Sequence, residues 1–199
     1  MSTNQFVAER LIVPARRVFM SDVGKAALSA SAVAILAGCE SMASGQADTS
    51  ASDAEILNVA LGLEHEAIGA YQLGAESGLL QKPVLDVAVL FQSHHKAHRD
   101  ALMGAISKLG GAPVESKSLD DYAASLGAAS LKSQTDVLML AAKLEKGAAN
   151  AYLGVIPSFG DRNIAQVAGR LAADETMHWT ALAGALGQPL PQNALTFGA

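Results

Sequence analysis

The sequence contains one stretch twice, and this duplication limits the fold more than any other feature. Leu63–Tyr71 recurs as Leu144–Tyr152. Each copy is followed by a turn and by a second segment that carries histidines, and there residues 90–105 align with residues 170–185 without a gap. The chain is therefore predicted to contain a helical hairpin twice, which indicates a bundle of four long helices.

The composition agrees with an all-α domain. Hydrophobic residues make up 50% of the chain and aromatic residues only 5%, with abundant alanine, which favours closely packed helices over a β-sandwich. The net charge is -5 and no Lys/Arg cluster lies in the repeated part, so nothing would neutralise the phosphates of a nucleic acid. The only cysteine, Cys39, lies outside the repeat, so any metal in the domain must be held by Glu and His.

The N-terminal part of the chain has the layout of an export signal. A polar stretch ends in Arg16-Arg17, and an alanine-rich apolar run follows over residues 23–38. This run is too short for a spanning helix, which needs about 20 apolar residues. The arginine pair resembles a twin-arginine signal, and Leu36–Cys39 resembles a lipobox, in which the cysteine is acylated after cleavage.

This layout divides the chain into an export signal with lipobox at residues 1–39, a flexible tether at 40–51 and a folded domain at 52–199. The mature protein is accordingly expected in the cell envelope, periplasmic and anchored to a membrane as a lipoprotein through Cys39. The alternative is an amphipathic or disordered N-terminal arm. No nucleic-acid partner is expected, and a homodimer is left open.

Apolar periodicity and capping residues predict where the helices lie. Ser52–Glu55 reads as a capping box that starts the first helix. Residues 113–132 are too long for a hairpin turn and contain a short helical pattern at 119–126, so we expect a crossover between the second and third helices. The long helices are expected at about residues 52–77, 84–109, 135–155 and 162–186.

Glutamates and tyrosines occupy matching positions in the two repeats. Because each residue advances about 100° around a helix, Tyr71 lies two turns along on the face of Glu64, and Tyr152 lies likewise relative to Glu145. Both glutamates stand beside an apolar stripe, where an unpaired carboxylate is unfavourable. One such residue alone would suggest a rim position bent toward solvent, but the repetition favours a partnered core position.

The last helix adds a Glu-x-x-His pair, Glu175 and His178, whose spacing puts both side chains on one face. With the glutamate and tyrosine of each preceding repeat, this arrangement resembles the ferritin-like superfamily over about residues 52–186. The resemblance implies a ferritin-like antiparallel four-helix bundle with a di-metal centre. In that family two helices each give a glutamate and the other two each give Glu-x-x-His.

The second helix departs from the family pattern. His95 stands where the alignment with Glu175 requires a glutamate, and His98 matches His178. Three carboxylates therefore remain, and Tyr71 and Tyr152 are expected within hydrogen-bonding reach of them. The residues expected to hold metal are Glu64, His95, His98, Glu145, Glu175 and His178.

Other polar residues nearby are predicted to lie outside the site. His94 and Asp100 point elsewhere on their helix and are expected on the surface. His65 and Glu66 follow Glu64 too closely to share its face.

The predicted cofactor is a transition metal, bound as a pair or as a single ion. The family resemblance implies iron first, whereas the extra imidazole favours zinc, copper or a single metal; manganese is a further alternative. One hypothesis is an exported metal-binding protein with oxidase- or peroxide-related activity. The other is a non-catalytic envelope bundle whose degenerate site has a structural or interaction role. Whether the protein is an enzyme is left open.

Overall fold

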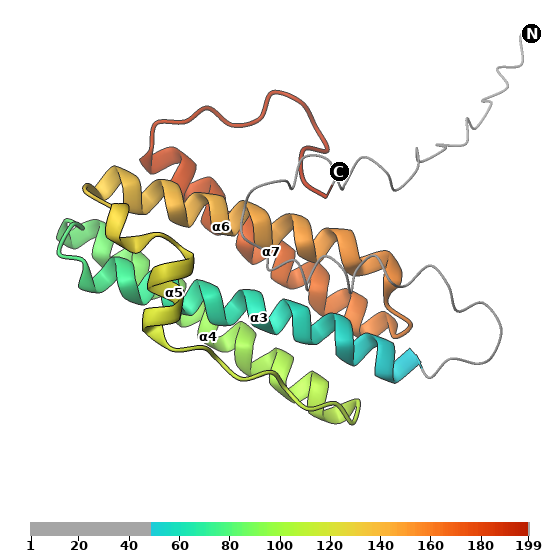
Figure 1. Ribbon diagram of the computed structural model, residues 1–199. Helices are drawn as coiled ribbons and strands as arrows, with labels where there is room; N and C mark the ends of the chain where they lie inside the picture. The colour runs from blue at the N-terminus through green and yellow to red at the C-terminus, as the bar shows by residue number, and fades with distance from the viewer. Residues whose placement is uncertain (1–48, 199) are drawn as a thin grey trace, which may run out of the picture.

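The computed structural model describes residues 49–198, and within them it is all-α (Figure 1). The predicted bundle of two hairpins with a long crossover is confirmed. The long helices are α3 (Thr49–Glu76), α4 (Lys82–Lys108), α6 (Gln134–Val155) and α7 (Arg162–Ala185). None of the helices in this part of the chain is long and apolar enough to cross a membrane. The predicted signal and Cys39 lie outside the described residues.

The start of the domain differs from the prediction. Helix α3 begins at Thr49 rather than at Ser52, so the last residues of the predicted tether are helical and Ser52 does not cap the helix. Asp53 instead makes a tertiary contact. It is 1% exposed, and its carboxylate accepts hydrogen bonds from the backbone N–H groups of Gly160 at 2.9 Å and Asp161 at 3.0 Å. This carboxylate fastens the α6–α7 turn to α3.

Replacing Asp53 with alanine is expected to destabilise the metal-free protein by about 2–4 kcal/mol, because two backbone N–H groups lose their acceptor. Urea denaturation followed by circular dichroism measures this change. The matched control is Asp86→Ala, which removes an exposed pair with Lys82 and should change stability by less than about 1 kcal/mol. Equal effects of the two substitutions would contradict the role of Asp53.

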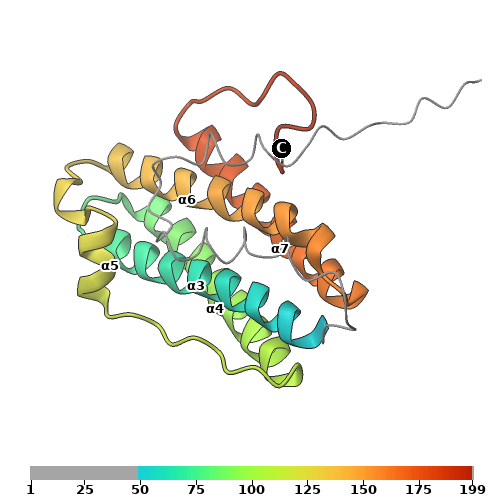
Figure 2. The ribbon, with the colours of Figure 1, turned by 45° about the vertical axis from the view of Figure 1, so that its right-hand side comes forward.

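The crossover connects α4 to α6 in the chain and runs back along the bundle (Figures 1 and 2). It carries α5 (Leu119–Ser125) and the short 3-10 helix η2 (Ala128–Ser130), close to the predicted helical pattern. Tyr122 of α5 packs on α3 at Gly69, where a β-carbon would lie only 2.6 Å from the tyrosine ring. A glycine is therefore needed for this close approach, which anchors the crossover to the first hairpin.

Two apolar clusters fill the bundle on either side of a polar layer. The first contains Leu57, Ala60, Leu61, Leu102, Ile106, Tyr152, Ile164, Ala168, Leu171 and Ala172. The second contains Tyr71, Phe91, Leu138, Ala142, Trp179, Leu182 and Ala183. Along each helix, the glutamates and histidines of the predicted site fall between the two clusters. These side chains are therefore shielded from water, in surroundings where each polar atom needs a partner.

Candidate metal centre

All six predicted donor residues converge in the polar layer, and none is more than 6% exposed. Their ligand atoms form two groups, and within each group the atoms lie within 4.8 Å of one another. The first group is Glu64, His95, His98 and Glu175; the second is His95, Glu145, Glu175 and His178. The two groups share His95 and Glu175, so they could hold two neighbouring metal ions.

The duplication explains this symmetry. Glu64 of α3 and His98 of α4 form one side of the centre, while Glu145 of α6 and His178 of α7 form the other. The shared positions come from α4 and α7, one from each hairpin. The alignment of the two repeats matches His98 with His178. In the structure these two histidines accordingly occupy corresponding positions in the two ligand groups.

His95 joins the two halves. Its Nδ1 lies 2.8 Å from Glu64 Oε2, and its Nε2 lies 3.1 Å from Glu145 Oε1. Burial alone would lower the pKa of His95, but the hydrogen bonds with Glu145 and Glu64 raise it to about 11. In the metal-free protein His95 is therefore an imidazolium that donates from both nitrogens and partly neutralises the three carboxylates.

Glu175 has ion pairs but no hydrogen bond. Both of its oxygens are buried and make no hydrogen bond, and the same holds for Nδ1 of His98. The Glu175 carboxylate nevertheless lies 3.0 Å from His98 Nδ1 and 3.5 Å from His178 Nδ1. Burial and the neighbouring Glu145 raise the pKa of Glu175. A buried carboxylate with ion pairs but no hydrogen bond is uncommon, and it can accept a cation as a further partner.

These separations fit a metal ion. Bonds of about 2.0–2.2 Å from a transition metal to nitrogen or oxygen put neighbouring ligand atoms roughly 3–3.5 Å apart. Carboxylate oxygens and imidazole nitrogens are ligands that such ions accept. The donor set and the Glu175 carboxylate, which makes no hydrogen bond, therefore both suit a transition metal.

The two tyrosines lie within hydrogen-bonding reach of core carboxylates, as predicted, and each reaches a carboxylate across the bundle. The Tyr71 hydroxyl donates to Glu145 Oε1, and the Tyr152 hydroxyl donates to Glu64 Oε1. Each tyrosine thus holds the glutamate of the opposite repeat. Burial and the adjacent carboxylates raise the pKa of both phenols well above the usual value, which keeps them protonated as donors.

The outer nitrogens of His98 and His178 reach two residues that the sequence analysis did not place in the site. His98 Nε2 lies 3.2 Å from Asp174 Oδ2, and His178 Nε2 lies 2.9 Å from His94 Nδ1. The prediction that His94 points away as a surface residue was therefore wrong: it is only partly exposed and contacts the centre. Partners of this kind fix the orientation of a ligating imidazole.

The sequence contains a signal that could have identified His94 and Asp174. His94 precedes His98 by one helical turn, Asp174 precedes His178 in the same way, and the two occupy matching positions in the duplication. Asp100 is exposed and pairs with Arg99, as predicted for a surface residue. His65 is buried outside the site, where its Nε2 lies 3.1 Å from the carbonyl oxygen of Val114.

Metal binding is expected to release protons and to strengthen as pH rises. Burial alone would lower the pKa of His98, but the facing carboxylates of Glu175 and Glu64 raise it to about 10, and that of His95 is about 11. Both imidazoles are thus charged at neutral pH, and a metal must displace a proton from each one that it binds. Calorimetric titration with Zn²⁺ in buffers of different ionisation enthalpy counts these protons. An affinity independent of pH would contradict the expectation.

The fold and the buried centre together define a helical bundle with a carboxylate–histidine core. The chain belongs to the ferritin-like domain family, which matches residues 52–188. Its fold is also similar to the crystal structure of a conserved hypothetical protein, rv2844, from Mycobacterium tuberculosis, with a TM-score of 0.60 and 20% sequence identity. That match covers 74% of this chain and 99% of the other, and supports the fold alone. The comparison with curated proteins found no match.

Proposed function

We propose that this protein binds transition-metal ions in the core of its bundle through Glu64, Glu145, Glu175, His98 and His178, with His95 between the two metal positions. The observation that carries the proposal is the Glu175 carboxylate, which is buried among five other donors yet makes no hydrogen bond. In the metal-free protein its partners are ion pairs with His98 at 3.0 Å and His178 at 3.5 Å, and a bound cation would add ligand bonds to this carboxylate.

The types of donor residue indicate which metals the site can bind. Iron is the first expectation from the family, and a pair of ions would use both groups of ligands. Three imidazoles beside three carboxylates also suit zinc, copper or a single ion, with manganese as a further alternative. A redox-active metal would supply electron transfer, which is the basis for proposing oxidase- or peroxide-related activity.

The surrounding residues have definable tasks in such a centre. Tyr71 and Tyr152 hold Glu145 and Glu64 through hydrogen bonds, and Asp174 and His94 orient His98 and His178. The apolar clusters above and below exclude water, which strengthens the electrostatic interactions inside.

A second candidate function rests on His95. Its two nitrogens already form hydrogen bonds with Glu64 and Glu145, so part of the polar core has hydrogen-bond partners without a metal. On this alternative the protein is a non-catalytic envelope bundle, in which the polar core fixes how the helices pack.

Metal analysis separates the two functions. Protein purified without added metal is expected to contain about one or two transition-metal ions per chain, as a shared-ligand centre requires. Chelation should remove them and lower the melting temperature, because an ion that binds only the folded state stabilises it. A chain that contains no metal and takes up none of iron, zinc, copper or manganese would support the structural alternative.

We also propose that the protein acts in the cell envelope as a membrane-anchored lipoprotein acylated at Cys39. The support is the order of Arg16-Arg17, the apolar run and the lipobox in the sequence. Replacing both arginines with lysine is expected to block export, which fractionation of cells with an antibody to the chain would measure. Normal processing of this variant would exclude the twin-arginine route.

A further inference from the structure

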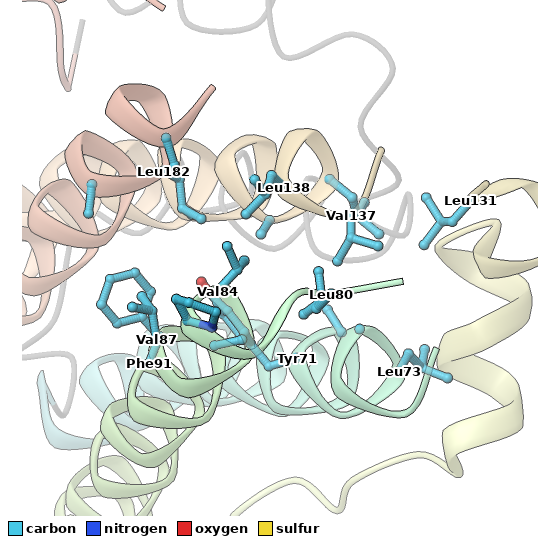
Figure 3. A pocket seen from close by; sticks show the side chains of 18 of the residues that line it. Tyr71, Leu73, Leu80, Val84, Val87, Phe91, Leu131, Val137, Leu138 and Leu182 are labelled. Carbon is cyan, nitrogen blue, oxygen red and sulfur yellow. The ribbon is translucent and has the colours of Figure 1, made fainter. Parts of the chain in front are cut away.

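Apolar side chains surround a cavity of about 240 Å³. Figure 3 shows the side chains that line it. Residues of all four long helices line it, together with the turn between α3 and α4 and the end of the crossover. Its larger lining side chains include Leu73, Leu80, Val84, Val137, Leu138 and Leu182. Val87, which is 42% exposed, is among the lining residues and gives the cavity a side open to solvent.

The inner wall of the cavity is shared with the metal centre. Tyr71 and Phe91 both line the cavity. On their other side, the Tyr71 hydroxyl donates to Glu145, and the Phe91 ring stacks on the His178 ring with centroids 4.1 Å apart. A single layer of side chains therefore separates anything in the cavity from the proposed metal ligands.

The lining determines what can bind. None of the lining residues is charged, and the Tyr71 hydroxyl, the only polar side-chain group among them, is already occupied by Glu145. Water needs two to four polar partners to be stable inside a protein, and this lining offers no free polar side chain, so an apolar ligand is favoured over ordered water there. A dry cavity of about 150 Å³ holds benzene, so on this scale the cavity described here accommodates about ten carbon atoms.

We propose that this cavity binds an uncharged apolar molecule of about ten carbon atoms, with one end against Tyr71 and Phe91. The ligand is a small free molecule, because the acyl chain of a membrane phospholipid is longer than the cavity holds. Binding depends on the packing of the bundle and not on metal, so it stands apart from the proposed function.

The probe is naphthalene, whose carbon skeleton matches this size, added to the metal-free full-length chain and followed by its own fluorescence. Saturable binding of one molecule per chain is expected, with displacement by a short linear alkane. Absence of saturable binding to the unmodified chain would overturn the proposal. Because no metal is present, a failure of metal binding would leave this result unchanged.

Two substitutions that fill the cavity locate the site. Ala88→Phe on α4 and Ala141→Phe on α6 both introduce a large ring into the lining, and each is expected to weaken naphthalene binding at least tenfold. The matched control is Ala101→Phe, at an exposed position of α4, which should leave binding unchanged. Circular dichroism shows which variants are folded, and one folded cavity variant suffices. Equal binding by that variant and the control would overturn the proposed location.

A final arm tests the membrane as a source of the ligand. Phosphatidylcholine vesicles are expected not to displace naphthalene, and association of the chain with vesicles is expected to be the same for the unmodified chain and Ala88→Phe. Displacement by vesicles, together with weaker vesicle association of Ala88→Phe, would identify a lipid chain as the occupant and overturn the assignment to a small free molecule.

Discussion

Replacing Glu175 with alanine is expected to lower metal affinity by more than about 100-fold, a loss beyond that seen when only an outer partner of a ligand is removed. Glu175 belongs to both ligand groups, so its loss affects both metal positions at once. His178→Ala is also expected to abolish binding at its own position. Competition with a chromogenic chelator measures the affinity, and Glu55→Ala, at an exposed position at the far end of α3, is the control.

Glu175→Ala should have a much smaller effect on the stability of the metal-free protein than on metal affinity. Glu175 makes no hydrogen bond, and burial together with Glu145 raises its pKa, so ionisation of this carboxyl group costs free energy in the metal-free protein. Removing the carboxylate also removes its ion pairs with His98 and His178, so these two effects oppose each other and the stability of the metal-free protein is expected to change by less than about 3 kcal/mol. A strong loss of metal-free stability with unchanged metal content would indicate that the polar core is structural.

The sequence was sufficient for the fold because the same information occurs in it twice. Single glutamates such as Glu64 and Glu145 are ambiguous on an apolar stripe, but their identical spacing to a tyrosine in both repeats removes the ambiguity. The long connection between α4 and α6 was also predictable, since residues 113–132 exceed any hairpin turn. The matching of His98 with His178 followed from the same register.

The contacts that the sequence did not reveal are those that side chains make from one helix to another. From its angle on α4 alone His94 is predicted on the surface, but its ring reaches His178 on α7. Asp53 was read as part of a helix start, whereas its carboxylate reaches the α6–α7 turn, far along the chain. Such contacts are set by how the helices pack against one another, which local periodicity does not specify.

Replacing His95 with glutamate tests why this chain differs from its family. The variant has four carboxylates in place of three, and the new one stands between Glu64 and Glu145, where two metal positions share it. We expect affinity for Fe²⁺ to rise by about tenfold or more, because hard oxygen ligands replace an imidazole whose proton must first be displaced. His95→Gln, which removes the imidazole without adding charge, should instead weaken iron binding.

His95→Glu should lower the stability of the metal-free protein. There the imidazolium of His95 links Glu64 and Glu145, and a fourth carboxylate in its place would crowd like charges in a buried layer. The metal-free variant is thus expected to be less stable by several kcal/mol and to recover when Fe²⁺ is added. Unchanged iron binding by His95→Glu, with no loss of metal from Glu175→Ala, would mean that the histidine–carboxylate layer serves packing alone. If His95→Glu binds iron more tightly and its metal-free form is less stable, then His95 lowers the metal affinity of the natural chain and stabilises its metal-free form.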